Sequence, residues 1–398
     1  MSMTTSPSLP QSVPMIPPGT IPEDDVGLVS LYFNRHPFEQ VISFDFVDEM
    51  NAVALMVFQQ SPMAVVDALC SIGSVYLGED SQGALLPLAI ARRARTLAAL
   101  RVKDPSRELE QMLLMALSLG AMEGIDTSCK PHERTSFTLI AYTSSIIHNY
   151  LESGHPLSSL AKYFIRALAR LDMIMSISHL RRNAIRTGIW LETESHTPDR
   201  FMGYTTTLMP LLEELCGLAE DIKRNEQSVD HGPVSPDDSP SIMDRVGDLR
   251  FQIESWRWNY PMGVSAVSAE RLLAHADAYR AAALLMLFRL LHPAGSSLES
   301  DQTALSMAEE VMSHLRRAPE ELGLLTWPAF IASCELQSEL DRALAITVFN
   351  SIYSVRKTGT SLQTLKFVTG RVWRARDESR DWNWMNLSQQ YPGECVPI

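Results

Sequence analysis

Residues 157–179 read LSSLAKYFIRALARLDMIMSISH, and they carry the strongest secondary-structure signal in the chain. Apolar side chains recur there at intervals of three and four, which is the spacing of one face of an α-helix. These apolar residues are Leu160, Tyr163, Phe164, Ala167, Leu168, Leu171, Ile174 and Met175. The pattern predicts an amphipathic helix whose apolar face packs against other helices.

The other side of this predicted helix carries basic residues four positions apart, Lys162, Arg166 and Arg170. They have two interpretations. They form either a basic stripe for an anionic partner or an ordinary face in contact with solvent. Because charged side chains on helices are usually solvated, we expect the second.

Helical signals recur on both sides of this segment. Ser61-Pro62 and Asp104-Pro105 are typical helix starts, with a capping side chain followed by proline in the first turn. Gly78 is typical of a helix end. Further helices are predicted before the His36-Pro37 break and over residues 84–101, 133–151, 243–256, 266–292, 301–317, 328–356 and 361–376.

These signals together predict an all-α fold, because neither strand alternation nor a fixed repeat is present. We expect a single array of about ten to twelve helices without significant sheet. Residues 278–291 are apolar nearly all round and predict a central buried helix. The predicted organisation is a disordered Ser/Pro-rich leader over residues 1–25, a helical domain over 26–386 with a flexible polar loop near 223–242, and an irregular tail over 387–398.

Composition limits the classes of function. Of the 398 residues, 45% are hydrophobic, which is enough for a large core and excludes a chain that is disordered throughout. The net charge of -13 argues against nucleic-acid binding, although a local basic patch could still provide it. There is no apolar run of about 18 residues and no secretory signal, so we expect a cytoplasmic or nuclear protein away from membranes.

Candidate reactive residues are dispersed. The cysteines, Cys70, Cys129, Cys216, Cys334 and Cys395, are widely spaced without any Cys-x-x-Cys pair, so we expect most of them to be buried and reduced. The chain has 19 methionines, which could line an adaptable pocket or fill the core, and we expect the core for Met112, Met115, Met122, Met173 and Met175.

No catalytic pattern is apparent. Phosphate-binding loops, dinucleotide fingerprints, nucleophile elbows and His-Glu-x-x-His are absent. His275 and Asp277 are two apart and point to different sides of a helix, so His275 is predicted to be a hydrogen-bonded core or boundary residue. The remaining candidates are predicted to be exposed, and they are His132, His155, Glu213-Glu214 and Glu309-Glu310. We therefore assign no catalytic, cofactor-binding, metal-binding or DNA-binding residue.

Several segments resemble the fungal-specific transcription factor domain that follows the zinc cluster in many fungal regulators. They are LYFNRHPFEQVISFD (31–45), YFIRALARLDMIMSIS (163–178), DRFMGYTTTLMPLLEELCGLAED (199–221), HADAYRAAALLMLFRLLH (275–292), LLTWPAFIASCELQSELDRALAITVF (324–349), Val372-Trp373 and Asp381-Trp382. They occur in the family's order and span roughly residues 28–386. Within them, we interpret Trp327-Pro328 as an aromatic anchor at a helix start.

The resemblance implies a transcription regulator, with residues 26–386 as its regulatory domain. The family usually carries six cysteines upstream that bind two zinc ions and place a helix on DNA. No cysteine or basic cluster precedes residue 28, so we expect no DNA recognition by this chain alone. Three explanations stay open: a regulator without such a module, a missed upstream exon, or a domain diverted to another task.

The leading hypothesis is a nuclear or nucleocytoplasmic regulator that acts through protein partners, either a second copy or a DNA-binding regulator. The resemblance also leaves room for a small apolar ligand, because family members that respond to sterols bind them in this helical region. We assign no residue to such a pocket. A second hypothesis is an enzyme or ligand-binding protein of secondary metabolism on the same scaffold. A third is a dimerisation scaffold.

Overall fold

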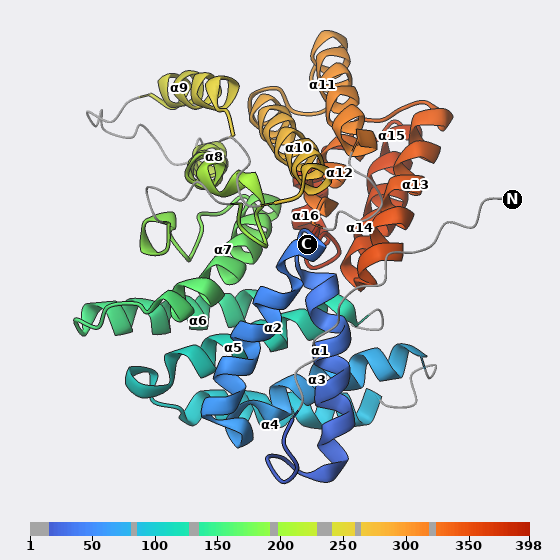
Figure 1. Cartoon of the computed structure of the whole chain (residues 1–398). Helices are drawn as coiled ribbons and strands as arrows, with labels where there is room; N and C mark the ends of the chain where they lie inside the picture. The colour runs from blue at the N-terminus through green and yellow to red at the C-terminus, as the bar shows by residue number, and fades with distance from the viewer. Residues whose placement is uncertain are drawn as a thin grey trace, which may run out of the picture.

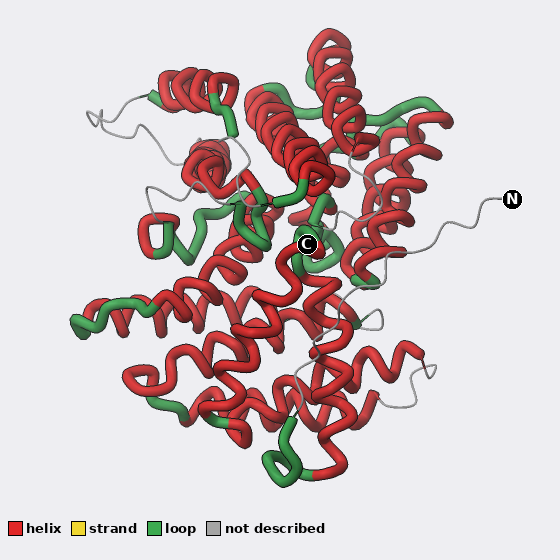
Figure 2. Tube along the Cα trace, viewed as in Figure 1, coloured by secondary structure: helices red, strands yellow, loops and turns green. Residues whose placement is uncertain are grey.

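The computed structural model describes residues 16–80, 86–126, 135–191, 198–228, 241–258, 264–317 and 324–398. These residues form helices and connecting loops (Figure 2), and their one β-bridge, between Asp199 and Gly203, is isolated. The predicted all-α class is confirmed for the described part of the chain. The predicted leader and polar loop fall largely on residues 1–15 and 229–240, which lie outside it.

The first helices form the lower part of the molecule in Figure 1. They are α1 (Glu23–Gln40), α2 (Val47–Gln60), α3 (Pro62–Asp80), α4 (Leu86–Val102) and α5 (Pro105–Ile125). Helix α3 is the centre of this group, because it packs against α1, α4 and α5. Asp104 caps α5 as predicted, accepting a hydrogen bond from the Ser106 N–H at 3.0 Å.

The middle of the chain continues with α6 (Ser136–Glu152), α7 (Ser159–His179), α8 (Met209–Ser228) and α9 (Ile242–Ser255). Two short 3-10 helices, Thr187–Ile189 and Tyr204–Leu208, lie between α7 and α8. Helix α7 is the helix predicted from the opening pattern. It contacts α5 and α6 on one side and α8 on the other, and it thereby joins the lower and upper parts of the molecule (Figure 1).

The last part contains α10 (Ala266–Leu291), α11 (Leu298–Arg317), α12 (Thr326–Ser333), α13 (Glu339–Arg356), α14 (Gly359–Phe367), α15 (Arg374–Asp377) and α16 (Trp384–Gln390). A π-helical segment, Val368–Trp373, makes α14 and α15 one continuous helix. Helix α10 is buried along most of its length, as predicted. Trp327 is fully buried in the first turn of α12, and this confirms the predicted aromatic anchor.

With α14, the π-helical segment and α15 counted as one, the described residues form fifteen helices, so the predicted number of ten to twelve is too low. The segment predicted as one helix over 328–356 is two, because Ser338 caps α13 by accepting a hydrogen bond from the Asp341 N–H. The predicted irregular tail begins too early, because α16 continues to Gln390. This helix packs against α7 and buries Trp384. Helix α1 runs through Pro37 to Gln40, and α3 runs past Gly78 to Asp80.

Candidate ligand-binding cavity

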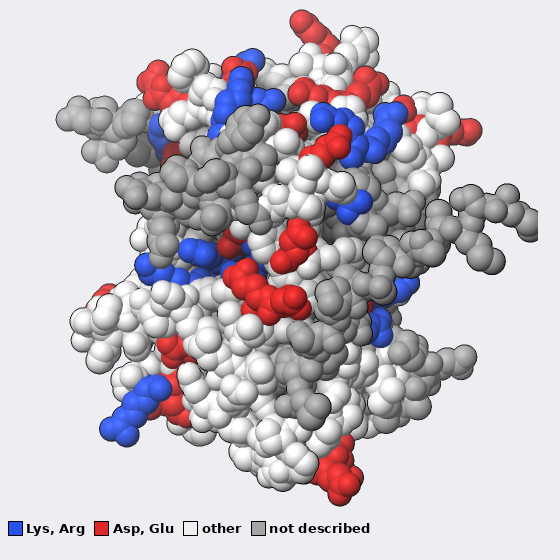
Figure 3. Space-filling view, in the orientation of Figure 1, with Lys and Arg blue, Asp and Glu red and all other residues white. Residues whose placement is uncertain are grey.

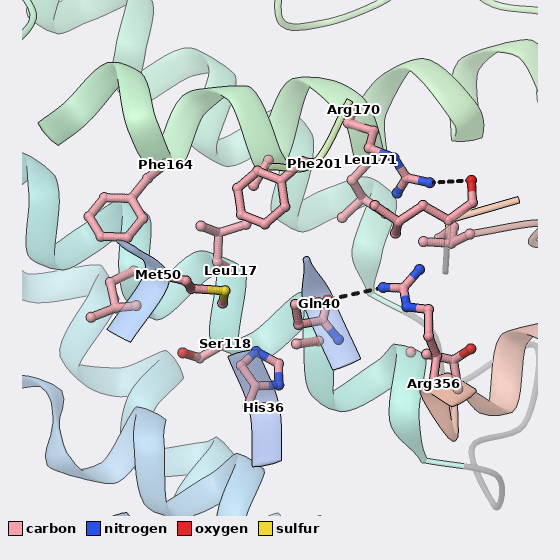
Figure 4. A pocket seen from close by; sticks show the side chains of 18 of the residues that line it. His36, Gln40, Met50, Leu117, Ser118, Phe164, Arg170, Leu171, Phe201 and Arg356 are labelled. Atoms are coloured by element: carbon pink, nitrogen blue, oxygen red, sulfur yellow. Dashed lines mark hydrogen bonds between the residues drawn. The ribbon is translucent and has the colours of Figure 1, made fainter. Parts of the chain in front are cut away.

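A cavity of about 110 Å³ lies where the first and last parts of the chain meet. Helices α1, α2, α5 and α7 form its walls, and the connection between α13 and α14 closes one side (Figure 4). The volume is several times the roughly 10–15 Å³ that one water molecule requires on this measure. The space is therefore large enough for a small organic molecule or for several waters.

Most of the cavity wall is apolar. Each of three helices contributes side chains spaced for one helix face: Met50 and Ala54 from α2, Leu114, Leu117 and Ala121 from α5, and Phe164, Ala167 and Leu171 from α7. Phe201, from the loop before α8, completes this wall. Burial of apolar surface is the main source of affinity in such a site, so the wall suits a hydrophobic ligand body.

Two arginines lie together on one side of the cavity (Figure 4). Arg170 from α7 donates from Nη2 to the Tyr279 hydroxyl and to the Leu324 carbonyl, both at 3.2 Å. Arg356, the last residue of α13, donates from Nε to the Glu39 carbonyl and from Nη2 to Gln40 Oε1 at 3.5 Å. Both side chains are buried, with Arg170 7% and Arg356 4% exposed.

The charge of Arg356 is poorly compensated. Burial, with a smaller contribution from the neighbouring charge of Arg170, lowers the pKa of Arg356 to about 9. Burial also lowers the pKa of His36, another residue of the cavity wall, to about 3, with a smaller contribution from Arg356. His36 is therefore neutral at pH 7, and its Nδ1 lies 3.0 Å from the Tyr76 hydroxyl.

Four polar atoms of the cavity residues are buried without a hydrogen-bond partner in the described part of the chain. They are Ser118 Oγ, Tyr163 Oη, Arg356 Nη1 and Thr358 Oγ1. Buried polar groups in folded proteins are nearly always paired, so each of these atoms requires a partner from solvent or from a ligand. The cavity thus combines an apolar wall with a small set of unused donors and acceptors.

The basic residues of α7 differ from the prediction. Arg170 does not face solvent, because Tyr279 of α10 and Leu324, just before α12, cover it. Arg166 is partly buried with Nη1 3.7 Å from Asp199 Oδ2. Lys162 is partly exposed. The solvated interpretation is therefore wrong for Arg170, and the spacing of these residues gave no indication of the burial.

Other candidates follow the predictions more closely. His275 is buried beside the Tyr279 ring at 4.6 Å, but neither ring nitrogen has a hydrogen-bond partner within the described residues. Four cysteines are buried and form no disulfide: Cys70, Cys216, Cys334 and Cys395. The five methionines expected in the core are buried as well. His155, Glu309 and Glu310 are exposed, whereas Glu213 is half-buried and paired with Arg186 at 2.7 Å. Cys129 and His132 lie outside the described residues.

Arg356, Gln40 and His36 were not singled out from the sequence. None of them belongs to a recognisable motif, and no spacing links residue 356 to residues 36–40. Only the contact of the α13 C-terminus with α1 brings them together.

The outer surface gives no separate signal for nucleic acid on the face shown in Figure 3, where acidic and basic side chains lie next to one another. Within the described ranges, no group of three or more His, Cys, Asp or Glu side chains could hold a metal ion. No helix in those ranges is long and apolar enough to span a bilayer.

Comparison with known families identifies the family of the chain. The profile of the fungal specific transcription factor domain matches residues 48–392, which is most of the chain. The chain belongs to this family, and membership indicates a regulator of transcription. Neither a curated protein nor a solved structure matches the chain.

Proposed function

We propose that this protein is a nuclear transcription regulator whose helical domain senses a small, largely apolar molecule and acts on transcription through protein partners. The partner would be a second copy of the chain or a DNA-binding regulator. The observation that carries the sensing part is the cavity, because its walls come from helices at both ends of the chain. A ligand that contacts α1, α5, α7 and the α13–α14 connection would change how these helices pack.

The proposal predicts that deleting the gene changes the transcription of a set of genes. A variant whose cavity is filled should fail to restore that transcription when it replaces the deleted gene. Ala167 lines the cavity, so Ala167→Phe would occupy space that the ligand needs. RNA sequencing would compare the deletion strain complemented with wild type, with Ala167→Phe, or with Ala141→Phe. The last is the control, because Ala141 is exposed on α6.

We expect wild type and Ala141→Phe to restore the gene set, and Ala167→Phe to leave it altered while circular dichroism shows a folded chain. Loss of a single metabolic step with unchanged transcripts would contradict the proposal and favour the alternative, an enzyme or ligand-binding protein of secondary metabolism. If Ala167→Phe restored the whole gene set, ligand sensing by the cavity would be contradicted, while the role in transcription would stand.

A further inference from the structure

The two arginines of the cavity differ from other buried arginines in the described part of the chain. Arg289 is 2% exposed, and it pairs with Glu335 and with Asp301, whose Oδ1 lies 2.8 Å from Nη1. Arg200 is also 2% exposed, with Glu49 Oε1 at 3.3 Å. These pairs follow the rule that a buried charge is retained only beside an opposite charge.

Arg170 and Arg356 have no such partner. Neither forms an ion pair within 4.0 Å with any carboxylate of the described residues. Glu39 is the neighbouring acid, but its carboxylate is bonded to Arg35 Nε at 2.7 Å, and only its backbone carbonyl accepts from Arg356. Ile398 also lines the cavity, and its main-chain oxygen accepts from Thr360 Oγ1 at 3.2 Å.

Two adjacent guanidinium groups thus line a mostly apolar cavity, and one of their N–H groups, Arg356 Nη1, is still unused. Guanidinium groups bind carboxylates through paired hydrogen bonds, and such bonds are strongest where solvent is excluded. An anion at this position would supply the missing counter-charge for both arginines. Inorganic anions alone would leave the apolar wall formed by Met50, Leu117 and Phe164 without a partner.

We propose that the cavity selects a small amphipathic acid, whose carboxylate binds between Arg170 and Arg356 and whose apolar body lies against α2, α5 and α7. This inference rests on the proposed sensing function and adds the chemical class of the ligand. Ser118 Oγ lies away from the arginines in Figure 4 and is unpaired, so it can bind a second polar group on the ligand body.

The test uses the full chain and isothermal titration calorimetry. The probes are straight-chain carboxylates from hexanoate to dodecanoate, the primary alcohols of the same lengths, and inorganic phosphate. We expect the best carboxylate to bind at least about tenfold more tightly than its matching alcohol, and phosphate alone to bind more weakly than that carboxylate. The series also reports the length that the cavity accepts.

Variants separate the head-group contact from general effects. Arg356→Gln should abolish the preference for acids while leaving alcohol affinity unchanged, and Arg356→Lys should retain part of the preference. Arg374→Gln is the matched control, because Arg374 is exposed and pairs only on the surface with Glu378. If Arg356→Gln does not fold, Arg170→Gln provides the same comparison.

Equal affinity for acids and alcohols, unchanged acid preference in the folded variant, or no binding by any probe would overturn the inference. Phosphate binding as tightly as the best carboxylate would also overturn it, because the site would then recognise an anion without an apolar body. These outcomes leave the regulatory proposal intact, since that proposal fails only on the transcript measurements.

Discussion

Three histidines lie where a charged ring would be poorly solvated: His36, His179 and His275. Burial lowers the pKa of His36 and His275 to about 3 and that of His179 to about 4. All three are therefore neutral in the folded protein near pH 6, where an unfolded histidine with a pKa of about 6.5 becomes protonated. The folded state binds fewer protons, so acid destabilises it.

His275 allows a direct test, because its ring nitrogens have no hydrogen-bond partner among the described residues. Its folded pKa is below the unfolded value. The stability it contributes is therefore present above pH 6.5 and is lost as the pH falls toward 3. This loss amounts to about 1.4 kcal/mol per pH unit. Urea titrations at pH 7 and pH 5 would measure the free energy of unfolding of both proteins. The decrease between these two pH values should be about 2 kcal/mol smaller in His275→Phe than in wild type.

The matched control is His155→Phe, because His155 is exposed after α6. We expect this variant to keep the wild-type dependence of stability on pH. If the free energy of unfolding of His275→Phe changed with pH as much as that of wild type, His275 would have the same pKa in the folded and unfolded states.

Single residues also show where sequence reasoning fails. The spacing that placed Arg170 opposite the apolar face of α7 is correct for an isolated helix. That face nevertheless meets a second layer, α10 and Leu324, which the pattern of one helix cannot reveal. Arg356 gave no signal at all, since its role depends on a contact with Glu39, 317 positions away in sequence.

At the scale of elements, the packing of α3 on α1 depends on a glycine. Helix α3 crosses α1 so closely that a Cβ atom at Gly73 would overlap the backbone carbonyl of Leu28. The obstacle is main chain rather than a flexible side chain, so the helices would have to move apart. A Cβ atom at Gly78, five residues later on the same helix, would meet no atom within 4 Å.

The two glycines should therefore respond in opposite directions to the same substitution. Gly73→Ala should lower the free energy of unfolding by about 1–3 kcal/mol through overpacking. Gly78→Ala should raise it by about 0.5–1 kcal/mol, because alanine has the higher helix propensity and meets no neighbour. Guanidinium titrations monitored by circular dichroism would measure both. A loss at Gly78 as large as that at Gly73 would refute the close approach.

The elements themselves were largely predictable because capping residues and apolar spacing are local signals. Asp104, Ser158 and Ser241 accept hydrogen bonds from backbone N–H groups at the starts of α5, α7 and α9. The errors occurred where tertiary packing overrides local preference. Helix α1 passes through Pro37, and α16 extends to Gln390, into the tail from residue 387 that was expected to be irregular.

At the scale of the whole molecule, contacts between distant segments join the ends of the chain. Arg356 bonds to Glu39, and Ser388 Oγ in α16 donates to the Ser178 carbonyl at the end of α7 at 3.2 Å. The cavity lies beside the first of these links, because Arg356, α1 and Ile398 all belong to its wall. Separate unfolding of the N-terminal helices would break the contact between Arg356 and Glu39 and expose the cavity.

We therefore expect the chain to unfold as one cooperative unit, in accord with a single helical domain over residues 26–386. All seven tryptophans follow residue 189, so their fluorescence reports on the last half of the chain, whereas far-ultraviolet circular dichroism reports on every helix. Denaturation curves from the two probes should coincide. A circular-dichroism transition that precedes the fluorescence change would instead identify α1–α6 as an independent unit. In that case, a ligand in the cavity would shift the earlier transition toward the later one, because it binds only where both parts are folded.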